Sequence, residues 1–192
     1  MPERVGATSA EGTARVALTG TPGTGKSAVG ARLRRRWRTE EVADLALRLG
    51  AGRRLRRGVE VDLVRLSRRL RVAPDRTLPV VVVGHLAHLL PVSDVVVLRC
   101  HPVELARRLG RARRGNAGDR RANVEAEATD VVLVEALSLG RRVWEVDTTG
   151  RSVESVARRV AAIVRSRRRP AVGAVDWLSD PAVTDYLLRR QR

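Results

Sequence analysis

Cysteine is almost absent from this 192-residue chain, and so are the apolar segments that mark membrane or secreted proteins. The single Cys100 excludes an internal disulfide and a zinc site made of cysteines, and its place after the apolar run 95–98 indicates a small core residue. No apolar run approaches the ~20 residues of a membrane-spanning helix, and residues 1–12 lack the apolar centre of a signal peptide. We therefore expect a cytoplasmic protein with no membrane partner.

Aromatic residues make up only 2% of the chain, and phenylalanine is missing altogether. A platform that stacks the bases of single-stranded nucleic acid is therefore not expected. The three histidines, His85, His88 and His101, do not show the i, i+4 spacing of a helical zinc site. A metal ion held mainly by histidine is not expected either.

Lysine is also scarce, although the chain is strongly basic. Of 38 basic residues all but Lys26 are arginine, and the 21 acidic residues leave a net charge of +17. A field this positive attracts polyanions such as nucleotides or RNA, and RNA would be contacted mainly through its phosphates. The alternative is a solvated basic surface without a partner.

Predicted strands and helices alternate along the chain. The β-branched runs at 80–83 and 95–98 are typical of strands buried on both faces of a parallel sheet, and shorter apolar runs predict strands at 15–19 and 143–146. Helices are expected after Ser27 and over 39–49, 59–71, 102–111, 121–139 and 152–164, with loops at 51–58 and 110–119. This order predicts an α/β fold of three layers, in which helices cover both faces of a parallel sheet of about five strands.

We expect one domain over residues 1–167, followed by a tail over residues 168–192. The tail carries Val175, Trp177, Leu178, Tyr186, Leu187 and Leu188 among charged residues. It is either a terminal helix docked on the core or a segment that binds a partner.

The segment from Gly20 to Ser27 reads Gly-Thr-Pro-Gly-Thr-Gly-Lys-Ser and matches G-x-x-x-x-G-K-[ST] between a predicted strand and a predicted helix. Its glycines let backbone N–H groups turn inward around phosphate oxygens, and the helix that follows presents its positive end. Lys26 is placed to reach the β- and γ-phosphates of ATP, and the Ser27 hydroxyl to bind Mg²⁺. That the only lysine stands here fits the need for a compact ammonium group.

A second magnesium-organising acid is not evident. The strand at 80–83 ends in Val83, Gly84 and His85, and Asp94 precedes its strand, at the sheet edge opposite to the one where ligands bind. Magnesium is therefore expected to be held by Ser27, the phosphates and water. His85 either orients a water or a substrate oxygen, or is a loop histidine bonded to backbone.

Three stretches resemble the adenylate kinase 6 family of small P-loop nucleoside-monophosphate kinases, also described as ATPases of ribosome assembly. They are the phosphate loop, the segment Gly84-His85-Leu86-Ala87-His88-Leu89-Leu90-Pro91, and Asn123-Val124-Glu125-Ala126-Glu127 with its continuation at 131–136. With Asp44-Leu45-Ala46 and Glu60-Val61-Asp62, the similarity spans roughly residues 14–165. It implies a nucleoside-monophosphate-kinase-like fold with a monophosphate-binding insertion at about 36–60 and a short lid at about 113–123.

The resemblance also implies the site residues. ATP contacts would come from Gly23, Gly25, Lys26, Ser27 and Ala28, His85 would match the family's functional histidine, and Arg114 would match the lid arginine that closes on the phosphates. The chain departs from the family at Val83, where an acid usually stands two residues before the histidine. An extra lid residue also makes Arg113 a competitor of Arg114.

The expected activity is a broad-specificity nucleoside-monophosphate kinase that uses ATP and Mg²⁺, with AMP as first acceptor, with ATPase activity and a role in small ribosomal subunit maturation. A small ribosomal subunit protein and rRNA are the macromolecular partners that this implies. Three alternatives stay open: mainly a ribosome-assembly ATPase, a kinase of another small metabolite, or a nucleotide-dependent RNA binder without catalysis.

Overall fold

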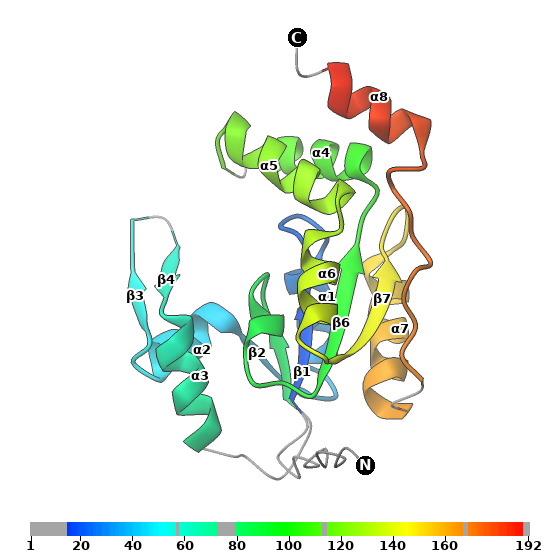
Figure 1. Ribbon diagram of the computed structural model, residues 1–192. Helices are drawn as coiled ribbons and strands as arrows, with labels where there is room; N and C mark the ends of the chain where they lie inside the picture. Colours follow the sequence, from blue (N-terminus) through cyan, green and yellow to red (C-terminus); the bar gives the residue numbers. More distant parts are fainter. Residues whose placement is uncertain (1–14, 57, 73–79, 113–114, 167–168, 190–192) are drawn as a thin grey trace, which may run out of the picture.

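The computed structural model describes residues 15–56, 58–72, 80–112, 115–166 and 169–189. In this part of the chain, five parallel strands form a sheet in the order β2-β5-β1-β6-β7 (Figure 1). The strands are β1 (Arg15–Thr19), β2 (Arg38–Glu41), β5 (Val80–Val83), β6 (Asp94–Arg99) and β7 (Arg142–Asp147). The expected parallel sheet of about five strands is confirmed.

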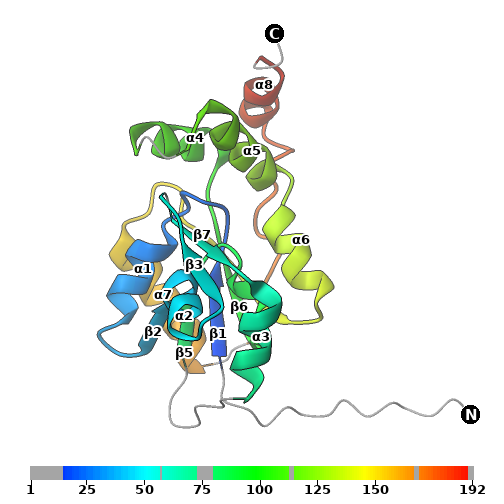
Figure 2. The ribbon, with the colours of Figure 1, turned by 90° about the vertical axis from the view of Figure 1, so that its left-hand side faces the viewer.

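Helices cover both faces of the sheet, as Figure 2 shows with α1 and α7 on one side and α6 on the other. The helices are α1 (Lys26–Leu33), α2 (Val42–Arg48), α3 (Leu63–Val72), α4 (Pro102–Arg111), α5 (Ala117–Ala128), α6 (Val131–Ser138), α7 (Val153–Ser166) and α8 (Pro181–Arg189), with a short 3₁₀ helix, η1 (Ala87–Leu89). Alternate residues of each inner strand enter opposite cores: Val81 and Val83 pack with α1, whereas Val80 and Val82 pack with α2 and α3. Both cores are almost wholly aliphatic, which explains the continuous valine runs.

The segment 38–41 is a strand, not the start of the predicted helix 39–49. Arg38-Thr39-Glu40-Glu41 pairs in parallel with Val80–Val83 along the sheet edge, and helix α2 begins only at Val42. An edge strand has one free side and is only partly buried here, so it tolerates a polar sequence. The local pattern of acids before an apolar helix therefore gave the wrong boundary.

Two further predictions need correction. The expected loop at 51–58 and the first turn of the predicted helix 59–71 form an antiparallel hairpin of β3 (Gly52–Arg54) and β4 (Val59–Val61). The predicted helix 121–139 is two helices, because Asp130 has a left-handed backbone with φ of 58°. Helix α5 also starts earlier than predicted, at Ala117, behind a reciprocal capping box between Asn116 and Asp119.

The tail packs against the domain, in agreement with the first of its two interpretations. Ala171 pairs with Trp144 beside β7, and α8 lies on α4, where Tyr186 and Leu187 join a small core with Leu105 and Leu109. Figure 1 shows α8 at the top of the molecule, beside the α4–α5 layer. None of the helices described in the chain is both long enough and apolar enough to cross a bilayer.

Candidate functional site

The phosphate loop follows β1 at the carboxyl end of the sheet and leads directly into α1. Gly20 and Gly23 have φ angles of 137° and 98°. A Cβ on Gly20 would lie 2.3 Å from the Leu98 carbonyl oxygen, and one on Gly23 would lie 2.7 Å from a Leu105 methyl group. Because β6 and α4 press against the loop this closely, only glycine fits at both positions.

Lys26 lies across the inside of this loop. Its Nζ donates a hydrogen bond of 2.9 Å to the Thr21 carbonyl oxygen, and the Thr24 hydroxyl donates to the same oxygen at 3.0 Å. The Lys26 side chain is almost buried, whereas Ser27 and Ala28 are exposed at the first turn of α1. The loop therefore combines a fixed ammonium group, an accessible hydroxyl and the positive end of a helix, which together suit a polyphosphate.

The segment after β5 lies beside the loop. The Thr19 hydroxyl donates to the His85 carbonyl oxygen at 3.1 Å. Although the side chain of His85 is exposed, the surrounding protein atoms and then the positive charge of Lys26 lower the pKa of its imidazole. His85, expected at the exit of its strand, therefore lies beside the phosphate loop. A histidine with a lowered pKa is neutral near pH 7.

His88, three residues further on, is fully buried and joins two elements. One ring nitrogen lies 3.0 Å from the Thr19 hydroxyl, and the other lies 3.0 Å from a Glu135 carboxylate oxygen. Burial lowers the pKa of His88, and the hydrogen bond and charge of Glu135 oppose that shift. His88 thus links the segment after β5 to both β1 and α6.

Glu41 is a residue of this site that the sequence analysis missed. It ends β2, directly beside Val83, and its carboxylate is partly buried. Burial raises its pKa, while the charge of Arg34, a hydrogen bond with the Ser27 side chain and the charge of Lys26 lower it. The only signal in the sequence was an acid just before an apolar helix, and it pointed to a helix start.

The loop after β7 forms another border of the site. Arg108 of α4 donates to the Thr148 carbonyl oxygen at 3.1 Å, and the Thr148 hydroxyl donates to the Arg99 carbonyl oxygen at 2.7 Å. The Thr149 hydroxyl accepts from the His101 backbone N–H at 2.8 Å. These bonds hold the loop 147–150 against the beginning of α4, at the strand ends where nucleotides bind in such sheets.

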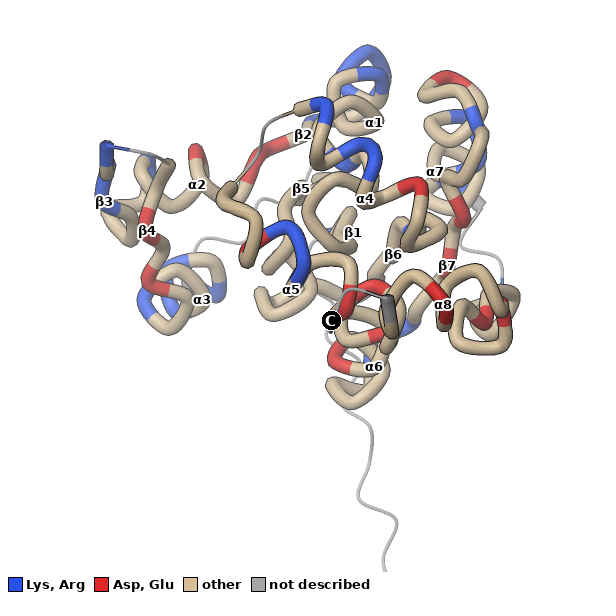
Figure 3. Tube along the Cα trace, turned by 90° about the horizontal axis from the view of Figure 1, so that it is seen from above, with Lys and Arg blue, Asp and Glu red and all other residues tan. Residues whose placement is uncertain are grey.

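The lid arginines are not placed. Arg113 and Arg114 both lie outside the described residues, so their competition for the arginine role stays open. Of the expected lid 113–123, residues 117–123 belong to α5. Viewed from above, basic positions occur on α1, α4, α5 and β3 (Figure 3).

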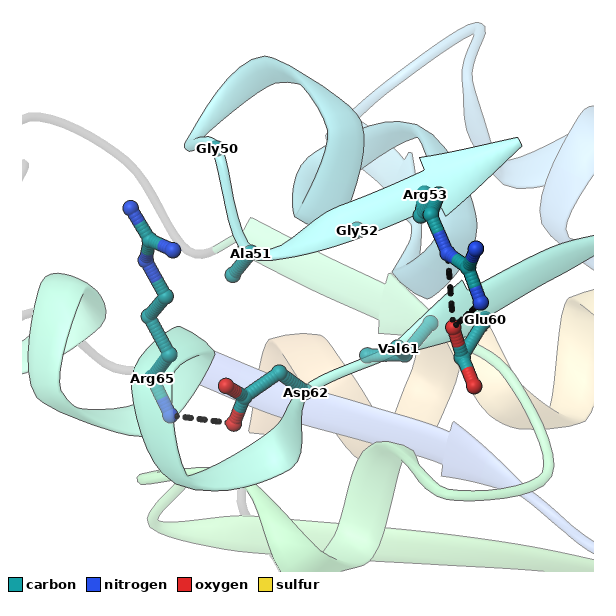
Figure 4. Close-up of a pocket in the computed structure, with 8 residues that line it drawn as sticks. All are labelled: Gly50, Ala51, Gly52, Arg53, Glu60, Val61, Asp62 and Arg65. Carbon is teal, nitrogen blue, oxygen red and sulfur yellow. Dashed lines mark hydrogen bonds and ion pairs between the residues drawn. The ribbon is translucent and has the colours of Figure 1, made fainter.

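The segment expected to hold the acceptor contains the β3–β4 hairpin and a pocket of about 360 Å³ at its base. Figure 4 shows Arg53 paired with Glu60 at 2.8 Å, and Asp62 accepting a hydrogen bond from the Arg65 backbone. Arg48 donates to a Glu40 carboxylate oxygen at 2.6 Å. This edge of the protein therefore carries two exposed arginines, Arg48 and Arg53, each paired with a carboxylate.

Burial also accounts for Cys100. The thiol lies in the small core beneath α4, and this burial raises its pKa to about 12. A thiol with such a pKa is protonated at neutral pH and is a poor nucleophile. The interpretation of Cys100 as a core residue is confirmed.

Known proteins that resemble this chain in sequence include a matching family model and two archaeal relatives with the same name. Residues 16–130 match the family described as "AAA domain". A protein of Thermococcus onnurineus named "Putative adenylate kinase" is 40% identical over 176 residues, which cover 90% of this chain and 97% of that protein. A protein of Archaeoglobus fulgidus with the same name is 41% identical over 171 residues, covering 86% of this chain and 92% of that protein.

Solved structures agree on the fold. Shikimate kinase from Acinetobacter baumannii in complex with shikimate superposes with a TM-score of 0.53 at 16% identity, over 81% of this chain and 95% of that one. At this identity the likeness establishes a P-loop kinase-like architecture and carries no information about the substrate.

Proposed function

The chain belongs to the family of these archaeal adenylate kinase relatives, as its resemblance to the adenylate kinase 6 family predicted, and from this premise we propose that it is a nucleoside-monophosphate kinase. The proposed reaction moves the γ-phosphate of ATP to AMP or a related monophosphate and yields two nucleoside diphosphates. The observation that carries the proposal is the position of Lys26, whose ammonium group lies inside the phosphate loop at the carboxyl end of the sheet. There it can neutralise charge on the transferring group.

The other residues have distinct proposed roles. The backbone of Gly23 and Gly25 would wrap the phosphates, with Ser27 and Ala28 at the helix end. Arg114 would close on the phosphates from the lid and exclude water. Neutral His85 would accept a hydrogen bond from a water, or donate one through its ring N–H to an oxygen of the acceptor phosphate. The hairpin segment, with its paired arginines, would hold the monophosphate.

Magnesium fits the groups that are present. The exposed Ser27 hydroxyl lies near the partly buried Glu41 carboxylate, and hard cations prefer such oxygen donors. Ser27 and Glu41 would hold Mg²⁺ together with ATP, and the ion would supply positive charge that offsets the charge of the phosphates.

A second candidate function is that of a cytoplasmic ribosome-assembly ATPase that binds rRNA and a small-subunit protein. The +17 charge favours it, as does a groove of about 250 Å³ between α1 and α7 that contains Arg35, Arg36 and Arg158 beside Trp37. Binding through phosphates predicts that affinity for rRNA falls steeply as salt is raised. A flat salt profile would contradict this second function.

One experiment separates the candidates. The purified protein is mixed with ATP, Mg²⁺ and a panel of monophosphates and other phosphate acceptors, with and without ribosomal subunits, and ADP and free phosphate are both measured. A kinase forms ADP in proportion to a monophosphate acceptor with little free phosphate. If release of free phosphate increases with ribosomal subunits and does not depend on AMP, the result would favour the assembly ATPase and reject the kinase.

A further inference from the structure

We infer that Glu41 supplies the carboxylate that organises Mg²⁺ next to Ser27, in place of the acid that the resembled family usually has at the position of Val83. The inference rests on the proposed ATP site and goes beyond it by assigning a residue that neither the phosphate-loop motif nor the resemblance identifies. The two positions lie side by side on neighbouring strands, so an acid at Glu41 can replace an acid at position 83 in organising Mg²⁺.

The strand register brings these positions together. Glu41 and Val83 are the last residues of β2 and β5, and they are direct partners in the parallel ladder. Neighbouring strands are about 4.8 Å apart. A carboxylate on the Glu41 side chain can therefore reach the region in front of the end of β5.

The side chains at both positions face α1. A Cβ on Gly30 of α1 would lie 2.9 Å from a Val83 methyl group and 3.6 Å from the Thr39 methyl group. Glu41 is two residues beyond Thr39 in the same strand, so it shares that face. Val83 is fully buried in the apolar core under α1, whereas Glu41 stands at the open end, next to Ser27.

The surroundings of Glu41 are those of the phosphate site. Burial raises the pKa of its carboxyl, while Arg34, the Ser27 side chain and Lys26 all lower that pKa, so these groups surround the carboxylate. Although Glu41 occupies the N-cap position of α2, its side chain makes no capping hydrogen bond within the described chain. Glu41 therefore does not act as a helix cap, which is the usual structural role of an acid at this position.

The neighbouring acid provides a contrast. Glu40 is engaged by Arg38 at 2.8 Å and by Arg48 at 2.6 Å, and consecutive strand residues point to opposite faces. Among the described residues, no three His, Cys, Asp or Glu side chains gather into a metal site. The cation is accordingly expected to bind together with ATP, with Ser27, Glu41, phosphate oxygens and water as its surroundings.

The test measures metal binding directly. Mn²⁺, a paramagnetic substitute for Mg²⁺, is titrated into the complex of the full chain with a non-hydrolysable ATP analogue, and free Mn²⁺ is followed by electron paramagnetic resonance. Glu41→Gln is expected to weaken Mn²⁺ binding about 10- to 100-fold, while binding of the analogue in EDTA is retained or strengthened because a negative charge is lost. Glu40→Gln is the matched control and should leave Mn²⁺ affinity unchanged.

A double variant makes the test sharper. Glu41→Gln combined with Val83→Asp moves the acid back to β5 and should recover Mn²⁺ affinity, provided that the variant still binds the analogue in EDTA. Equal Mn²⁺ affinity in wild type and Glu41→Gln would overturn the inference, whatever the double variant does. A wild type that binds Mn²⁺ with the analogue through Glu41 but phosphorylates no monophosphate would refute the proposed kinase function and leave the role of Glu41 standing.

Discussion

Glu127 accepts a hydrogen bond of 2.8 Å from the Nε of Arg99, and both side chains are only 2% exposed. The same guanidinium contacts Glu145 of β7 at 2.6 Å and also pairs with Asp130. Glu145 in turn accepts backbone hydrogen bonds of 3.0 Å from Gly173 and Ala174 of the tail. Arg99 therefore joins the end of β6 to helix α5, strand β7 and, through Glu145, the tail.

Removal of this guanidinium should destabilise the protein strongly. Arg99→Ala leaves buried carboxylates without their counter-charge, a change that typically costs about 3–5 kcal/mol. Equilibrium unfolding in urea measures the loss. Arg32→Ala is the comparison, because Arg32 pairs with Glu154 at 3.8 Å on the surface and should cost less than about 1 kcal/mol. Similar losses in both variants would show that the Arg99 network is not a stabilising centre.

The burial of His88 should make stability depend on pH. Because burial lowers its pKa below the ordinary value of 6.5, the unfolded state binds more protons than the folded state between the folded pKa and 6.5. The free energy of unfolding should therefore fall as pH drops from about 6.5 through the folded pKa. His88→Gln removes this proton uptake, and unfolding curves at several pH values should show a shallower loss on the acid side. An unchanged slope would contradict the prediction.

Lys26→Ala should abolish phosphoryl transfer while the fold persists. The ammonium group is the fixed charge inside the loop, and its loss should lower kcat at least about 100-fold. Circular dichroism and thermal unfolding check the fold, and a coupled assay of ADP formation checks activity. Arg159→Ala, an exposed change on α7, is the control for non-specific effects of losing one positive charge. If Lys26→Ala turned over as fast as wild type, the proposed ATP site would be refuted.

The two lid arginines should differ. We expect Arg114→Ala to lower kcat more than Arg113→Ala, because only the arginine in the correct register reaches the transferring phosphate. Steady-state kinetics at saturating ATP and AMP compares them. Equal effects would mean that the register inferred from the family resemblance is wrong.

The phosphate loop could be predicted from sequence because its function depends on consecutive residues. Gly20, Gly23 and Gly25 set the local backbone shape and Lys26 lies inside it, so the spacing of these residues alone carries the information. The buried strands at 80–83 and 94–99 could also be predicted from sequence, since both faces of each strand are apolar. Edge strand β2 was not, because its polar sequence satisfies neither a strand pattern nor a core pattern.

What the sequence determined by itself was the α/β order, the phosphate loop and the family. What only the tertiary structure decided was which side chains from distant segments meet: Glu41 beside Val83 and Ser27, His88 between Thr19 and Glu135, and the tail against Arg99's partners. The physical reason is that periodicity and loop motifs act over a few residues, whereas strand register and buried ion pairs depend on how the sheet is assembled.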